Sequence, residues 1–208
     1  MTYNIGNIYS DFTMNFEDKP DFVIDYYTRY SIFFNNIKTF KDKEEVRLFI
    51  EINWHYLNAI YKKERFNDTV DSANKIKSLV DKEIERFNAI ELKDDCYYGI
   101  LLFKGMASYR LRDYKTSTLI FKTLTLFDNK NENYQNWLKH SIHSQRHWLT
   151  NTIYIVCILF IFTEMFFKFL ITNYYVRQTL LGIGLLGLMC NWIYEYYINR
   201  SFRKTNNN

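Results

Sequence analysis

The sequence is poor in the residues that interrupt helices or cross-link small domains. Its 208 residues include one proline, six glycines and three cysteines. Because proline and glycine end helices and shape tight turns, their scarcity favours long helices. Three cysteines do not make a disulfide framework, and no alternating polar and apolar run of useful length indicates a strand. The sequence therefore predicts an all-α fold.

Motifs that carry chemistry are also missing. The chain has no nucleophile elbow, phosphate-binding loop, H-E-x-x-H or C-x-x-C pattern, so we expect neither an enzyme nor a cofactor. His140, His143 and His147 recur at helical spacing, and two of them could approach a metal ion. No carboxylate or cysteine completes a set beside them, so no metal site is expected. Basic residues form no stripe, which argues against nucleic-acid binding.

Two long apolar runs, residues 148–172 and 176–198, occupy the last third of the chain. Each is close to the ~20 residues that a helix needs to cross the hydrocarbon core of a bilayer. Only residues 173–175 join them, which predicts an antiparallel transmembrane hairpin that enters and leaves on the same side. We therefore expect an integral membrane protein that ends in a polar, basic tail, residues 199–208.

Basic residues near the two runs predict their orientation. Lys139 and Arg146 precede the first run and three basic residues follow the second, whereas the join offers only Arg177. Because Lys and Arg are retained on the cytoplasmic side, we expect both termini and the soluble domain to be cytoplasmic. A bacterial inner membrane is the expected location, with an organelle membrane as the alternative.

Two charged residues and three glycines inside the runs are candidates for a role in the membrane: Glu164, Lys168, Gly182, Gly184 and Gly187. Glu164 and Lys168 share one helical face, and charge at mid-bilayer is costly. Three interpretations stay open: a self-neutralising ion pair, a proton or ion pathway, and an oligomer contact through Glu164.

The three glycines spell G-x-G-x-x-G, a pattern that also occurs in dinucleotide sites. No strand precedes them, so we interpret them as positions of close helix packing. An antiparallel hairpin would put Glu164 at the depth of Ile183, and Cys157 at the depth of Cys190.

Helical spacing of apolar residues organises the rest of the chain. Residues 1–19 show no clear period and are expected to be irregular. The next stretches predict helices with one apolar face each: 20–37, 42–63, 67–88, 94–111 and 114–127. A sixth helix from about Glu132 is expected to run into the first apolar run without a break. Residues 20–147 thus predict one helical domain.

Short turns at residues 63–65 and 112–113 join two of these helix pairs, and the flanking residues resemble tetratricopeptide repeats. The positions that match the packing residues of that family are Trp54, Leu57, Tyr61, Gly105, Tyr114 and Phe121. The resemblance covers about residues 44–131 as two degenerate units. Phe66 and Tyr114 are 48 positions apart, more than one repeat of about 34 residues, so the helix at 67–88 is overlong.

The resemblance implies a concave groove for a peptide or helix of a protein partner, lined by the first helix of each unit. By motif position the groove would present His55, Lys62, Lys63, Leu102, Met106, Tyr109 and Arg110. An acidic partner end would suit its basic residues. Ala59 stands where chaperone-binding members use asparagine, so chaperone tails are not expected. Stacks of such repeats usually need three units to bury a continuous core. The apolar surface that two units leave open must therefore be covered by neighbouring helices or by a second copy of the chain, so a homo-oligomer stays open.

These observations favour a membrane-anchored adaptor or scaffold that holds a partner protein at the cytoplasmic face. The alternative is a small subunit of a membrane transport, secretion or motor assembly that uses the hairpin and Glu164. Replacing Glu164 with glutamine would be neutral for the adaptor and damaging for a proton-coupled subunit.

Overall fold

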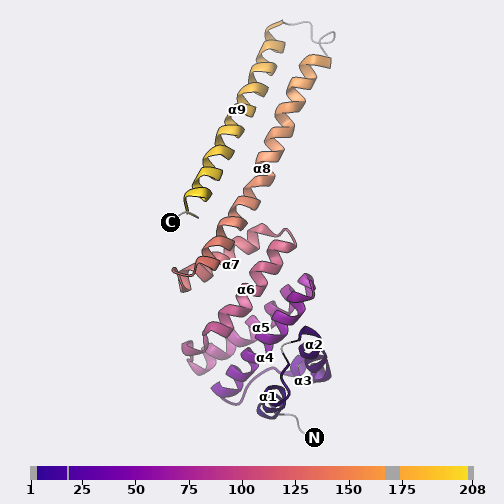
Figure 1. Ribbon diagram of the computed structural model, residues 1–208, viewed down its shortest axis with the longest axis vertical. Helices are drawn as coiled ribbons and strands as arrows, with labels where there is room; N and C mark the ends of the chain where they lie inside the picture. The colour runs from indigo at the N-terminus through magenta and orange to yellow at the C-terminus, as the bar shows by residue number, and fades with distance from the viewer. Residues whose placement is uncertain (1–3, 18, 167–173, 206–208) are drawn as a thin grey trace. The chain divides into compact units, whose positions relative to one another are not determined.

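The computed structural model describes residues 4–17, 19–166 and 174–205 (Figure 1). All regular structure within these ranges is helical, so the all-α prediction is confirmed. The chain divides into two compact units, Met1–Leu138 and Lys139–Asn208, and each is described by itself.

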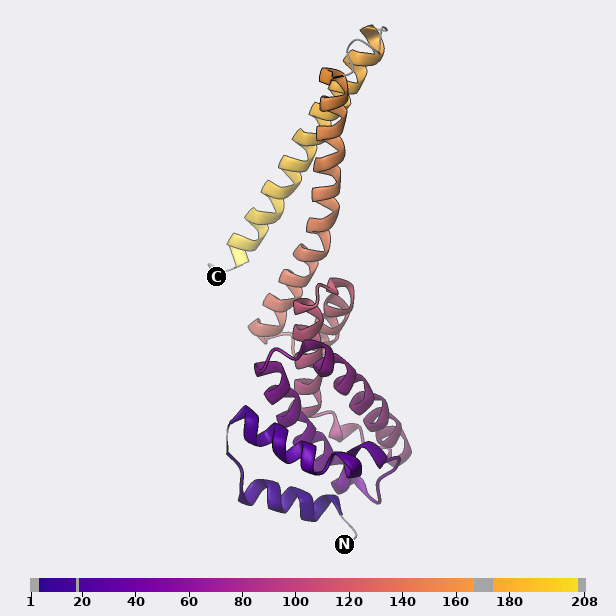
Figure 2. The same cartoon turned by 90° about the vertical axis from the view of Figure 1, so that its right-hand side faces the viewer.

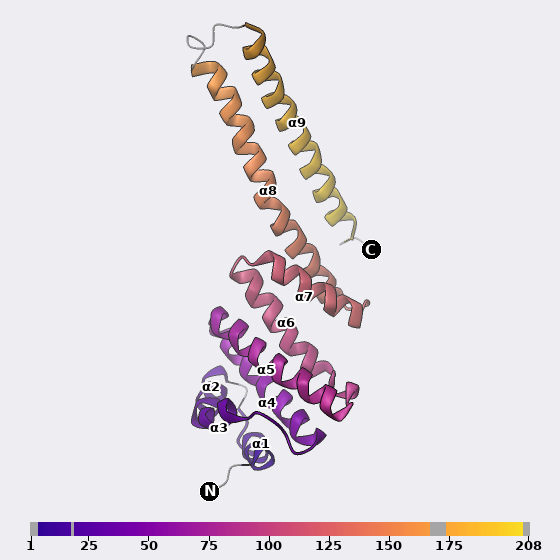
Figure 3. The same cartoon turned by 180° about the vertical axis from the view of Figure 1, so that it is seen from behind.

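Unit 1 is built from a series of helices and one short 3-10 turn. In chain order these are α1 (Ile5–Met14), α2 (Pro20–Arg29), α3 (Ser31–Asn36), α4 (Lys43–Lys62), α5 (Phe66–Phe87), η1 (Ile90–Leu92), α6 (Asp95–Arg110), α7 (Tyr114–Phe127) and the first residues of α8 (Glu132–Phe166). From α4 onward these bounds follow the predicted helices closely. Figure 3 shows α4, α5, α6 and α7 packed as successive neighbours.

Acidic side chains start three helices of unit 1, α4, α6 and α7. The Asp42 carboxylate accepts a hydrogen bond from the Glu45 backbone N–H at the start of α4. Asp94 does the same for α6 and Asp113 for α7. Such caps satisfy backbone donors that have no partner within the helix, so local sequence fixes where each helix begins.

The turns after α4 and α6 have the same geometry. Glu64 and Arg112 both adopt the left-handed conformation, with φ of 58° and 64°. In each turn the next residue donates its N–H to a carbonyl five positions earlier: Arg65 to Ile60, and Asp113 to Ser108. This is the hydrogen bond of a Schellman motif. The two helix pairs therefore reverse direction in the same way.

The core of unit 1 centres on α4, which packs against α1, α2, α5 and α6. Val46, Leu57 and Ile60 of this helix are fully buried. Two glycines of α6 permit close packing. A Cβ on Gly99 would overlap the indole of Trp54, and one on Gly105 would lie 3.0 Å from Phe121.

The N-terminal segment differs from the prediction. Residues 1–19 were expected to be irregular, yet Ile5–Met14 form α1 (Figure 2). Ile5, Ile8 and Phe12 are buried on one face, and the Asn4 side chain caps the helix by accepting the Gly6 N–H. Ten residues hold too few apolar positions for a clear period, so tertiary contacts define this helix.

The predicted helix over residues 20–37 is also different, because it is two helices. It breaks at Tyr30, which ends α2 and precedes α3 with a ψ of 13°. Pro20 occupies the first turn of α2, where its missing N–H has no cost. The break leaves α3 with only six residues.

Unit 2 contains the remainder of α8 and α9 (Tyr174–Thr205), which run antiparallel side by side (Figures 1 and 3). A Cβ on Gly184 would lie 2.9 Å from Ile161, and one on Gly187 would overlap the Cys157 sulfur. Gly182 has no such neighbour within 4 Å. The packing prediction therefore holds for two of the three glycines.

The register of this pair differs from the expected one. Cys157 is buried against Gly184 and Gly187, whereas Cys190 is exposed. The offset from the expected pairing is about one helical turn. The Cys157 thiol fits beside Gly187 because glycine has no Cβ there. This contact, rather than the length of the join, sets which residues of α8 and α9 lie opposite each other.

Both long helices are able to cross a membrane by length and composition. The candidate spans are Glu132–Thr163 and Tyr174–Tyr194. Only 12% and 11% of their most apolar windows are buried. The core helix of a water-soluble protein would be mostly buried, so these helices present their apolar side chains outward.

Candidate functional site

The N-terminal helices cover one end of the groove predicted from the repeat pattern. The His55 ring lies 5.4 Å from the ring of Phe12 and 4.9 Å from that of Phe16, measured between centroids. Lys63 forms an ion pair with Asp21 of α2 at 2.8 Å. These two groove positions therefore face the chain's own N-terminal segment.

The other end of the predicted groove is covered in a similar way. Tyr109 packs edge-on against Tyr114 and against Trp137 of α8. Leu102 and Met106 are half-buried against the core. Lys62 and Arg110 are exposed. The seven predicted residues are thus either half-buried or exposed.

Of the six residues predicted to pack the repeat, three are buried in unit 1 and three are half-buried. Leu57 and Phe121 are fully buried, and Phe121 stacks on Trp137. Tyr61 contacts Phe66 and Phe103. Three further contacts join Trp54 to Gly99, Gly105 to Phe121, and Tyr114 to Tyr109. The assignment of these positions to a repeat stays a prediction.

Two predicted intramembrane residues cannot be placed. Lys168 and the side chain of Glu164 lie outside the described part of the structure. Among the described residues no group of three His, Cys, Asp or Glu could hold a metal ion. His143 and His147 have ring centroids 6.0 Å apart.

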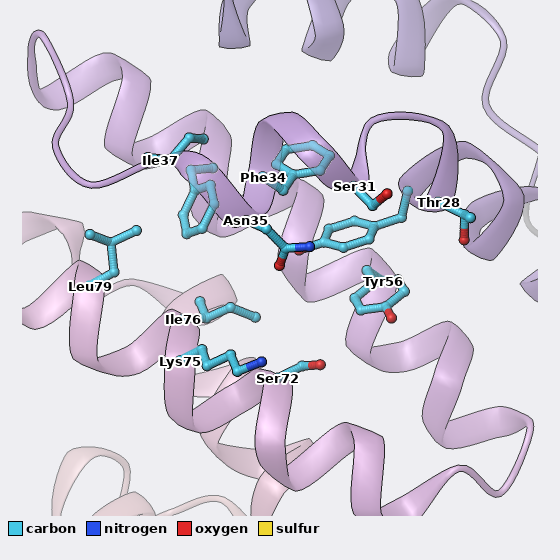
Figure 4. Close-up of a pocket in the computed structure, with 12 residues that line it drawn as sticks. Thr28, Ser31, Phe34, Asn35, Ile37, Tyr56, Ser72, Lys75, Ile76 and Leu79 are labelled. Atoms are coloured by element: carbon cyan, nitrogen blue, oxygen red, sulfur yellow. The ribbon is translucent and has the colours of Figure 1, made fainter.

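A pocket of about 360 Å³ opens beside α3, at residues that the sequence analysis did not single out. We call it the α3 pocket. It is lined by Tyr27, Thr28, Ser31, Phe34, Asn35, Ile37, Phe49, Tyr56, Ser72, Lys75, Ile76 and Leu79. Figure 4 shows Ser31, Phe34 and Asn35 facing Ser72, Lys75 and Ile76 across it.

The two walls of the pocket come from helices of different length. The α3 wall is six residues long, whereas α5 opposite has 22 residues. On α5, Ile76 is buried while Ser72 and Leu79 are half-buried. The overlong helix was visible in the sequence, but the break at Tyr30 that shortens α3 was not.

Stacked aromatic rings form the floor of the α3 pocket. The ring of Tyr27 lies between those of Phe34 and Tyr56, with centroid separations of 4.5 and 3.7 Å. The Tyr27 hydroxyl donates to Asn53 Oδ1 at 3.0 Å, and the buried Asn53 amide donates to the Phe49 carbonyl. Burial raises the pKa of Tyr27 well above its usual range, so the floor stays uncharged.

The rim of the pocket is polar. Thr28, Ser31, Asn35 and Ser72 surround the opening together with the exposed ammonium of Lys75. Among the described lining residues none is Asp, Glu, His or Cys. A hydroxyl without a neighbouring base is a poor nucleophile, so this arrangement is suited to binding an apolar group that carries hydrogen-bond acceptors.

A buried carboxylate holds the segment between α3 and α4 beside the pocket. Glu83 of α5 is fully buried and accepts the Phe40 N–H at 3.3 Å. It pairs with Arg86, which also donates to the Phe40 carbonyl. Within the described residues Glu83 Oε1 has no hydrogen-bond partner. The cluster ties the linker to α5 and so positions Ile37 in the pocket wall.

Comparisons of the chain with protein-family models, with curated proteins and with solved structures found no match. The resemblance to tetratricopeptide repeats therefore rests on the sequence of this chain alone.

Proposed function

We propose that the chain is a membrane-anchored adaptor. In this proposal unit 1 binds a partner protein and unit 2 anchors the complex in a lipid bilayer. Its action is to raise the local concentration of the partner at the membrane rather than to perform chemistry. The observation that carries the proposal is the outward apolar surface of α8 and α9 in a chain that also has a preformed binding pocket.

The apolar surface of unit 2 supports the anchor. Ile155 and Leu159 of α8 are 57% and 58% exposed, and Leu186 and Met189 of α9 are 64% and 61% exposed. In water each Å² of such surface costs roughly 25 cal/mol. Lipid chains would cover this surface without that cost. The excess of basic residues outside the hairpin supports an orientation with both termini in the cytoplasm.

The geometry of unit 1 supports a degenerate helical repeat of the tetratricopeptide type. The turns at Glu64 and Arg112 share one conformation, and each follows the first helix of a pair. In this proposal α1 and α2 cover one end of the two-unit stack, while the start of α8 covers the other end. They supply the cover that two units lack, so the stack requires no second copy of the chain.

The α3 pocket is the proposed partner site. Its aromatic floor is fixed before binding by the Tyr27–Asn53 hydrogen bond, which limits the entropy lost when a partner side chain enters. The predicted groove on α4 and α6 is the weaker candidate, because His55 and Tyr109 are already packed against aromatic residues.

The first test is membrane extraction combined with capture. The full chain should stay with the membrane fraction during extraction with alkaline carbonate and should be solubilised by a mild detergent. A photo-crosslinking amino acid at Thr28, an exposed residue on the rim of the pocket, should then trap a partner protein that the same group at Lys115 on α7 does not. Recovery of the chain in the carbonate supernatant would contradict the anchor. Equal trapping from both positions would contradict the pocket as partner site.

A further inference from the structure

We infer that the α3 pocket takes an acidic segment of the partner, with one large apolar side chain seated on the aromatic floor. This inference rests on the proposed adaptor function and adds the chemistry of the partner. It follows from the charges and apolar residues on both sides of α3.

A second hollow adjoins the α3 pocket. It measures about 720 Å³, lies along residues 29–39 and shares Ile37 with the pocket. Ile32 lines it and is 78% exposed. A segment that crosses α3 could therefore cover Ile32 while placing a side chain in the pocket.

The two hollows carry charge of one sign. Arg29 and Lys38 line the second hollow, and Lys75 lines the pocket. The described lining residues of both hollows include no aspartate or glutamate. Over residues 1–147 acidic residues are nearly as common as basic ones, so this surface departs from the rest of unit 1.

The three cations are available to a partner. In the described part of the chain, none of Arg29, Lys38 and Lys75 takes part in an ion pair. Carboxylates of an incoming segment would meet complementary charge here, which speeds association and selects against basic partners. The acidic character of the partner follows from this complementarity.

The size of the pocket suits one large side chain. At about 360 Å³ it lies at the lower end of ligand pockets, which range over about 300–1,000 Å³. A large aromatic side chain buried in such a pocket is a frequent centre of a protein interface. An anionic bilayer offers no such side chain, and three basic residues would contribute only about 1 kcal/mol each to lipid binding.

The test uses random 12-residue peptides displayed on phage and selected on the full chain in a mild non-ionic detergent. Enriched peptides should combine several Asp or Glu with one Trp, Phe, Tyr, Leu or Ile. Lys75→Glu should weaken the best peptide by about tenfold, measured by fluorescence anisotropy. Lys82→Glu makes the same charge change on α5 outside both hollows and should leave binding unchanged.

Ser72→Trp should also weaken binding, because the indole fills the pocket without changing charge. Enriched peptides without an acidic excess, or equal losses for Lys75→Glu and Lys82→Glu, would overturn the inference. Vesicles with anionic lipid that bind the chain through Lys75 while no peptide does would overturn it as well. The adaptor proposal would survive these results, since it fails only on carbonate extraction or on trapping from Thr28.

Discussion

The ring of Tyr27 lies flat against the ring of Tyr56, with centroids 3.7 Å apart and planes inclined by 10°. The stack stays in place because the Tyr27 hydroxyl donates to the buried Asn53 carbonyl. Tyr27→Phe keeps the ring but leaves that carbonyl without its donor. We expect the free energy of unfolding to fall by about 1–2 kcal/mol.

The measurement is urea unfolding of the full chain in mild detergent, followed by tryptophan fluorescence. Tyr61→Phe is the matched control, because no hydrogen bond of the Tyr61 hydroxyl is seen among the described residues. It should change stability by less than about 0.5 kcal/mol. Equal effects of the two variants would show that the Tyr27 hydroxyl does not stabilise the floor.

A second prediction concerns the close contact between α4 and α6. Gly99→Ala would drive a methyl group into the indole of Trp54. Overpacking of this kind costs about 1–3 kcal/mol. Gly6→Ala in α1 should have the opposite sign, because its methyl would meet only the Asn4 side chain at 3.6 Å and alanine favours helix by up to about 1 kcal/mol. Thermal unfolding of the two variants in parallel checks both signs.

These contacts show what the sequence could and could not predict. The sequence predicted α4 to α7 almost residue by residue, because α4, α5 and α7 each bury one apolar face and α6 is buried on most sides. It missed α1, because the three buried side chains of this helix are recognisable as a core face only where α1 packs against α4. It also missed the break at Tyr30, and with it the short α3. The α3 pocket is lined by residues from segments far apart in the chain, which no local pattern encodes.

The hairpin of unit 2 gives a similar lesson. Two apolar runs predicted two long helices, and α8 and α9 are present. The predicted position of Cys157 along the helix pair was wrong, because the prediction counted residues outward from the join between the two runs. The contact of its thiol with Gly187 decides the register instead, and packing of that kind is set by pairs of residues rather than by run length.

A third prediction uses the pH dependence of α1. Burial, and then the hydrogen bond and charge of Glu51, raise the pKa of Tyr9 to about 12. In the unfolded chain the phenol ionises near its ordinary value of 10. The contact therefore contributes stability in full below pH 10 and loses it as the pH rises from 10 towards 12.

Alkaline titration of the full chain, followed by tyrosinate absorbance and helical circular dichroism, tests this window. Tyr9→Phe should remove the component of the stability loss between pH 10 and 12 that comes from this phenol. Tyr61→Phe should retain that component. A Tyr9→Phe chain with an unchanged alkaline profile would show that the phenol does not hold α1 on α4.

The fourth prediction concerns Glu83, which is fully buried and bonds the Phe40 backbone N–H while pairing with Arg86. Glu83→Ala removes both contacts and leaves the Arg86 guanidinium without its carboxylate. The buried Phe40 N–H then lacks its acceptor, and an unsatisfied buried donor costs about 1–3 kcal/mol. Because Arg86 is 41% exposed, water can solvate its guanidinium, so we expect a loss of stability within that range.

Glu83→Ala should also free the linker that carries Ile37, so the α3 pocket should lose affinity for the selected peptide at a denaturant concentration that leaves the chain folded. Hydrogen exchange at the Phe40 amide should accelerate together with that loss. Glu85→Ala, at an exposed position on the same helix, should alter neither quantity. Fast exchange at Phe40 together with full peptide affinity would contradict the prediction. It would show that the linker does not shape the α3 pocket and that α3 alone holds that wall of the pocket in place.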